Sequence, residues 1–209
     1  MSNSTFVSEV SICNIALSWL GQPAITSLDD QSTNAELCKL NYPHLRDVLL
    51  SERQWVFAVL RHTSETADKP EFGEGFKHSI PPEYLRVSRV YRNVEAFDPN
   101  KWRTALGWRR EGEFIIAVEE IIYMWGTQQL TDTGLFSPMF TQALAARIAA
   151  DLCMPITENS TLQSKMYQLY LAKLSDAAAS DAVQGANEVI QANRLLDART
   201  SGFTIGRRF

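Results

Sequence analysis

The sequence has 209 residues, of which 45% are hydrophobic and 21% are charged, and this length fits one domain or a core domain with a modest insertion. That composition excludes wholesale disorder, collagen and coiled-coil rods. The chain has 20 Lys and Arg residues against 24 Asp and Glu residues, a formal charge of −4. Proteins that bind duplex DNA usually have more basic than acidic residues. Because this chain has a net negative charge, we do not expect it to bind nucleic acid through its overall charge.

The apolar spacing predicts a first helix from Ser8 to Leu20, which Gly21 and Pro23 should end. A second helix is predicted from about Thr33 to Arg53, with Pro43 inside it, where a proline kinks a helix or leaves a carbonyl unpaired. The apolar face of this second helix consists of Cys38, Tyr42, Leu45 and Leu49.

The central part of the chain lacks the helical spacing of apolar residues. Residues 62–75 are polar and rich in glycine and proline, which predicts a linker or a long loop. Residues 76–128 then show alternating patterns, including 102–108, and Glu111–Gly112 suits a hairpin turn. Ile121–Trp125 is predicted as a strand buried on both faces or nearly so. We therefore expect an antiparallel β insertion.

Helical signals return at Ser137–Pro138, where serine suits the N-cap and proline the first helical position. Pro155 is predicted to end this helix. A fourth helix should start near Asn159 or Ser160 and run toward Leu195.

These elements predict an α+β fold, an antiparallel helical bundle with a small inserted antiparallel β domain and an extended C-terminal arm. The expected divisions are the first half of the bundle at 1–62, the linker and β insertion at 63–130, the second half of the bundle at 131–197, and the arm at 198–209. No membrane span is expected, because Glu119 and Glu120 interrupt the longest apolar stretch.

The arm carries a charge of +3, two glycines and isolated apolar side chains. It is either a frayed terminus or a segment that becomes ordered on a partner. The residues that would make such a contact are Arg199, Phe203, Ile205, Arg207, Arg208 and Phe209.

The residue patterns offer little support for catalysis. Three histidines lie in three different predicted elements without metal-ligand spacing, and we expect no metal and no cofactor. Three cysteines, Cys13, Cys38 and Cys153, lie on apolar helical faces and are expected to be buried and inert. One alternative is a glycan hydrolase that uses two carboxylates of the β insertion, drawn from Glu111, Glu113, Glu119 and Glu120.

A mixed aromatic and basic cluster marks a second candidate surface. It consists of Trp102, Arg103, Trp108, Arg109 and Arg110. Such side chains can stack on nucleic-acid bases, which leaves a nucleic-acid-binding module as another alternative. They are also favoured anchors of protein interfaces, and the net acidity of the chain favours that second interpretation.

The order of these features resembles the head-to-tail adaptor family of short-tailed bacteriophages, the tail tubular protein A-like proteins. The matching pieces are the opening helix with its exit (Ile15–Ile25), the second helix closing on Trp55–Ala58, the proline-containing segment Ile80–Val87, and the helical return at Phe136–Phe140, followed by Ala143–Asp151 and Pro155–Thr157.

This resemblance implies a structural protein of the virion, not an enzyme, made in the host cytoplasm and located in the tail at the portal vertex. Members of the family form a ring of twelve copies between the portal protein and the tail nozzle protein. The ring extends the channel through which double-stranded DNA passes without sequence-specific binding. The resemblance also implies that the C-terminal arm reaches the portal.

Overall fold

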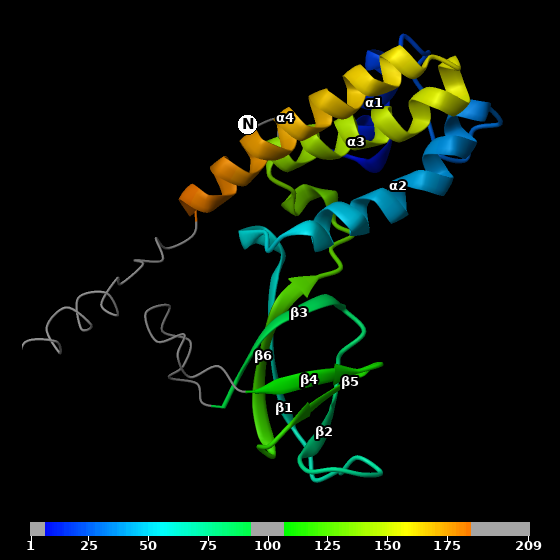
Figure 1. Ribbon diagram of the computed structural model, residues 1–209. Helices are drawn as coiled ribbons and strands as arrows, with labels where there is room; N and C mark the ends of the chain where they lie inside the picture. Colours follow the sequence, from blue (N-terminus) through cyan, green and yellow to red (C-terminus); the bar gives the residue numbers. More distant parts are fainter. Residues whose placement is uncertain (1–6, 93–106, 185–209) are drawn as a thin grey trace, which may run out of the picture.

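The structure is a computed structural model that describes residues 7–92 and 107–184. Within these residues, helices and two small antiparallel sheets form the predicted α+β fold. The helices are α1 (Glu9–Trp19), α2 (Thr33–Glu52), α3 (Pro138–Thr157) and α4 (Ser160–Gln184). Figure 1 shows the helices packed together at one end of the molecule and the strands gathered at the other. Because the strands follow α2 and precede α3, they are inserted between the two halves of the helical bundle.

The first two helices begin and end at the residues that the sequence indicates. The Ser8 hydroxyl accepts a hydrogen bond from the Ser11 N–H, and the Ser11 hydroxyl accepts one from the Ser8 N–H, which forms a capping box. Gly21 follows the end of α1 with φ of +69°, a conformation that glycine adopts without steric cost. Ser32 caps α2 by accepting from the Ala35 N–H. Both predicted helices are confirmed to within a residue at each end.

Pro43 lies inside α2, on the exposed side of the helix. Proline has no N–H, so it cannot donate a hydrogen bond to the carbonyl one turn earlier in the helix. On an exposed face, water can donate to that carbonyl instead. The predicted apolar face of α2, which is Cys38, Tyr42, Leu45 and Leu49, is buried. The burial of this face explains why the helix continues past the proline.

The predicted start of α3 is confirmed, since the Ser137 hydroxyl accepts from the Phe140 N–H at 3.2 Å. The prediction that Pro155 ends this helix is wrong, because α3 continues to Thr157. Pro155 falls in the last turn, where a missing N–H costs a single hydrogen bond at the helix end. Glu158, with φ of 52° in the left-handed region, terminates the helix instead.

α4 begins at Ser160, as predicted, and the Asn159 side chain accepts a hydrogen bond from the Leu162 N–H at 2.9 Å. It packs along α3 over most of its length (Figure 1). The predicted continuation of this helix toward Leu195 lies outside the described residues.

Trp55 closes the helical core at the end of α2. Its side chain is fully buried, and its indole N–H donates to the Leu49 carbonyl at 2.9 Å. The ring meets Phe140 of α3 at a centroid distance of 5.0 Å and an angle of 80°, an edge-to-face geometry that aromatic pairs favour. Trp55 therefore joins the two halves of the helical bundle. The short 3-10 turn that follows it (Val56–Ala58) connects α2 to the strands.

The strands form two three-stranded antiparallel sheets rather than one. The first has the order β1-β6-β3, formed by β1 (Val59–Glu65), β6 (Ile121–Gln128) and β3 (Tyr84–Tyr91). The second has the order β2-β5-β4, formed by β2 (Phe76–Ser79), β5 (Phe114–Ala117) and β4 (Trp108–Glu111). The predicted Glu111–Gly112 turn joins β4 to β5, with φ of +59° at the glycine. Of the predicted strand at 102–108, residues 102–106 lie outside the described part of the chain.

Two details of the strand prediction are wrong. His62–Glu65 were predicted to start a loop, but they belong to β1, which pairs with β6 from Val59 to Glu65. The strand is polar and exposed at most of these positions, so its pattern alone resembles a loop.

The prediction that Ile121–Trp125 is buried on both faces is also wrong. Ile122 and Met124 are fully buried, whereas Ile121 is 41% exposed. The other face carries Trp125, beside the guanidinium groups of Arg61 and Arg89 from the two flanking strands, at 5.7 and 5.0 Å from its ring centre.

A second hydrophobic core, to which both sheets contribute, holds the strands together. Its buried residues are Tyr84, Val87, Val90, Ile115, Ala117, Ile122 and Met124. The Tyr84 hydroxyl on β3 donates to the carbonyls of Leu60 on β1 and Met124 on β6, both at 3.1 Å, and burial raises the pKa of Tyr84 to about 12. His78, fully buried on β2, links the two sheets. Its ring nitrogens lie 3.1 Å from the Ser64 hydroxyl and 2.9 Å from the Glu119 carbonyl oxygen.

Two polar contacts fix the β region to α2. The Gln129 amide donates to the Asp47 carboxylate at 2.7 Å, just after β6. The Arg86 guanidinium on β3 donates to the Ser51 carbonyl in the last turn of α2 at 3.1 Å, where carbonyls lack partners within the helix. The C-terminal half of α2 therefore positions the β region.

Replacing Gly126 with alanine should lower the free energy of unfolding by about 2–3 kcal/mol, the cost of overpacking a close contact. An added Cβ would lie 2.0 Å from the Arg86 carbonyl oxygen and 2.9 Å from the Val87 Cα, so β3 would have to move away from β6. Urea unfolding of each variant measures the change. Gly107→Ala is the control, since a Cβ there meets nothing within 4 Å; equal stability of the two variants would contradict the prediction.

Candidate functional site

The predicted aromatic and basic surface falls partly on β4, an edge strand. Trp108 is half-buried and packs against the second core, whereas Arg109 and Arg110 are exposed. The Arg109 Nε lies 2.5 Å from a Glu111 carboxylate oxygen, and the Arg110 Nε donates to the Gly112 carbonyl at 2.9 Å. The other two predicted members, Trp102 and Arg103, lie outside the described residues.

A shallow hollow of about 300 Å³ lies beside this strand. Its lining is mainly apolar and includes Trp108, Ile116 and Val118, with Arg109 and Glu74 also contributing. Val118 is 70% exposed. An apolar hollow flanked by charges suits contact with a protein side chain more than with a phosphate backbone.

The structure places the four candidate acids in different surroundings. Glu111 is paired with Arg109, and Glu113 and Glu120 are exposed. Glu119 is partly buried, and one of its carboxylate oxygens lies 3.5 Å from the Arg92 Nε. The described contacts thus give Glu111 and Glu119 ion-pair partners of their own.

The histidines and cysteines also lie apart. His44 and His62 are exposed, and His78 is buried between the sheets. All three cysteines are buried, as predicted, and a hydrogen bond with Cys38, together with burial, raises the pKa of Cys13. Among residues 7–92 and 107–184, no group of three or more His, Cys, Asp or Glu could hold a metal ion.

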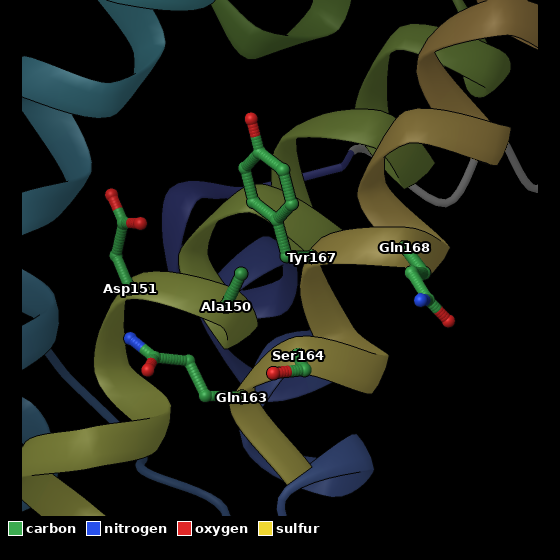
Figure 2. Close-up of a pocket in the computed structure, with 6 residues that line it drawn as sticks. All are labelled: Ala150, Asp151, Gln163, Ser164, Tyr167 and Gln168. Atoms are coloured by element: carbon green, nitrogen blue, oxygen red, sulfur yellow. The ribbon is translucent and has the colours of Figure 1, made fainter. Parts of the chain in front are cut away.

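A second hollow, of about 360 Å³, runs between α3 and α4. Figure 2 shows its six lining residues, with the Gln163 side chain reaching from α4 toward α3 and the Gln168 side chain pointing away. They are Ala150, Asp151, Gln163, Ser164, Tyr167 and Gln168. The hollow is open, and Asp151 is the charged residue among the six that line it, so it has the character of a surface groove.

A polar network that the sequence did not indicate lies next to this groove. Arg147 forms an ion pair with Asp151 at 3.3 Å, and its guanidinium lies 5.2 Å from the Tyr170 ring centre. The Tyr170 hydroxyl donates to both carboxylate oxygens of Glu52 at 2.8 and 2.9 Å. Burial raises the pKa of Tyr170, and the hydrogen bond to Glu52 adds to this effect. The network ties α4 and α3 to the end of α2.

Asp181 fixes the far end of α4. Its carboxylate accepts from the Val56 N–H at 3.0 and 3.2 Å. Burial raises the pKa of Asp181, although the hydrogen bond from Val56 and the charge of Arg53 act in the opposite direction. α4 is therefore anchored near its C-terminal end, and the described chain stops three residues later at Gln184.

The predicted contact residues of the arm lie outside the described residues. They are Arg199, Phe203, Ile205, Arg207, Arg208 and Phe209. In the part of the chain that the structure describes, no helix is both long and apolar enough to cross a membrane. Neither a protein-family model nor a curated protein sequence matched the chain.

Proposed function

We propose that this protein is a structural component of a bacteriophage virion, a head-to-tail adaptor that forms a ring between the portal and the tail nozzle. The ring would have twelve copies and would extend the DNA channel. The proposal places the protein in the tail at the portal vertex after synthesis in the host cytoplasm. It requires no cofactor and no catalytic residue.

One observation carries this proposal: four of the segments that resemble the adaptor family coincide with joints of the fold. Ile15–Ile25 spans the end of α1 and its exit, and Trp55–Ala58 spans the passage from α2 to the strands. Ile80–Val87 leads into β3, and Phe136–Phe140 starts α3. Such joints decide how a helical bundle carries an inserted β region, so a resemblance at these four supports a shared architecture.

The architecture suits a ring subunit. A ring closes through head-to-tail contacts between different surfaces of rigid neighbours. The helical core and the α2 contacts with Gln129 and Arg86 give this chain a fixed body. With −4 per subunit, the net charge of a ring repels DNA phosphates, which favours passage of the duplex over binding.

Two surfaces would serve the partners. The arm, with three arginines and three large apolar side chains, would contact the portal. The β4 surface with Trp108, Arg109 and Arg110 would contact the nozzle or a neighbouring subunit, since aromatic and arginine side chains dominate interface energies.

Electron microscopy of the purified protein mixed with the portal ring of the same virus tests the proposal. We expect a ring of twelve copies on one face of the portal, coaxial with its channel. Portal particles that remain bare at a tenfold molar excess of the protein would overturn the proposal. Double-stranded DNA alone is the specificity control, and it should not bind the protein at physiological salt.

A further inference from the structure

Two of the three cysteines meet where α1 packs against α2. Cys13 lies on the buried face of α1 and Cys38 on the buried face of α2, and both side chains are fully buried in the same hydrophobic core. The Cys13 thiol donates a hydrogen bond to the Cys38 sulfur. The two sulfur atoms are therefore direct neighbours, although they belong to different helices.

An ion pair near the two cysteines fixes how α1 and α2 lie against each other. A guanidinium nitrogen of Arg46, which is buried on α2, lies 4.0 Å from a Glu9 carboxylate oxygen in the first turn of α1. Residues four positions apart share one face of a helix. Cys13 is one such step after Glu9, and Cys38 is two such steps before Arg46. The ion pair and the thiol contact thus lie on the same two faces, as expected of antiparallel helices.

The third cysteine has different neighbours. The Cys153 sulfur on α3 lies 3.3 Å from the Thr157 hydroxyl oxygen and 3.7 Å from the Asn159 carbonyl oxygen. Both partners belong to the end of α3 and the start of α4, and neither is a thiol. Since the chain has three cysteines, Cys13 and Cys38 are the pair whose sulfur atoms meet.

Two neighbouring thiols differ from buried aliphatic side chains because they can be oxidised. The sequence predicted inert cysteines, since apolar spacing does not reveal a contact between two of them. The hydrogen bond from Cys13 lowers the pKa of Cys38, although burial acts in the opposite direction. A thiolate is the attacking species in thiol oxidation, so Cys38 is the sulfur of this pair that reacts first.

We propose that Cys13 and Cys38 form a redox-controlled disulfide that joins α1 to α2, with hydrogen peroxide as the oxidant. The Cys38 thiolate attacks a peroxide oxygen; a sulfur–oxygen bond forms, the oxygen–oxygen bond breaks, and the released hydroxide takes up a proton to become water. The Cys13 thiolate then attacks the Cys38 sulfur, where a sulfur–sulfur bond replaces the sulfur–oxygen bond and a second water leaves. Two thiols and one peroxide thus give one disulfide and two waters.

The disulfide adds a covalent link to a contact that the reduced protein holds by packing. It closes a loop over residues 13–38, which restricts the unfolded chain and so stabilises the folded one. Formation of the disulfide does not rest on the proposed function. Its timing does, because a virion leaves the reducing cytoplasm of its host and disulfides persist outside cells. The protein would fold with free thiols and acquire the link after release.

Counting free thiols tests the proposal. The folded full chain is purified under reducing conditions and treated with hydrogen peroxide, and the remaining thiols are labelled with N-ethylmaleimide in urea. We expect one label after treatment, on Cys153, against three on the untreated protein. Peptide mapping should show Cys13 linked to Cys38. Three labels after treatment would overturn the proposal, as would a link to Cys153 or a loss of labels without a linked peptide. The portal takes no part in this measurement, so its outcome leaves the proposed function untouched.

Cysteine variants separate the pair from general oxidation. Cys153→Ser is the matched control and should form the same link, whereas Cys13→Ser should form no link within the chain. Oxidation of the unaltered chain should raise the urea midpoint by about 1 M through loop closure, and dithiothreitol should reverse the shift. A linked protein that unfolds at the same or a lower urea concentration than the reduced one would contradict the stabilising role.

Discussion

Replacing Trp55 with alanine should lower the free energy of unfolding by about 4 kcal/mol, within the range for removing a buried tryptophan. The substitution leaves a large cavity where α2 meets α3, because the ring is fully buried against Phe140. It also removes the donor to the Leu49 carbonyl. Urea unfolding followed by circular dichroism of the helices measures the loss.

Trp55→Phe separates packing from hydrogen bonding. Phenylalanine keeps an aromatic contact with Phe140 but cannot donate to Leu49, so the loss of unfolding free energy should be about 1–2 kcal/mol, at most half of that for alanine. A loss below 1 kcal/mol for Trp55→Ala would show that the two halves of the bundle are held together by other contacts.

The ends of the helices were predictable because they depend on local chemistry. Ser8, Ser32 and Ser137 each supply the side-chain oxygen that the first N–H groups of a helix need, and Gly21 supplies a left-handed residue. Pro155 misled the prediction because the cost of a proline depends on its position in the helix. Pro155 lies two residues before the end of α3, so the helix is nearly complete where the proline interrupts its hydrogen bonds.

The strands were less predictable because pairing decides them. Residues 62–65 carry no apolar alternation, yet they form a strand since β6 provides partners along the whole of β1. Conversely, Ile121–Trp125 reads as continuously apolar, but one side of β6 faces Arg61 and Arg89, whose guanidinium groups pack on Trp125. The strand at 62–65 and the exposed side of β6 both depend on residues that are distant in sequence. The spacing of apolar residues within one segment does not reveal such neighbours.

The polar contacts between distant elements could not be inferred from spacing. Glu52 and Tyr170 are separated by 118 positions, and Val56 and Asp181 by 125. Neither pair belongs to a motif. Their common result is that α4 is fixed at two points, to the last residue of α2 and to the turn that follows it.

A chain that ends at Asp197 should keep its folded body but bind the portal at least 100-fold more weakly. The deletion removes Phe203, Ile205 and Phe209, and burial of each at an interface contributes about 1 kcal/mol. A total of about 3 kcal/mol corresponds to a factor above 100. The described helices and strands end before this segment, so the circular dichroism spectrum and the urea midpoint should not change. Titration of the portal ring with labelled protein measures the affinity.

Two full-length variants divide the effect between charge and apolar contact. Arg207→Gln with Arg208→Gln should weaken binding mainly at low salt, since exposed charges are screened as ionic strength rises. Phe203→Ser with Phe209→Ser should weaken it equally at low and high salt, because apolar burial does not depend on charge. If the chain ending at Asp197 binds the portal as tightly as the full chain, the arm is not the contact, and the body of the subunit must hold the portal by itself.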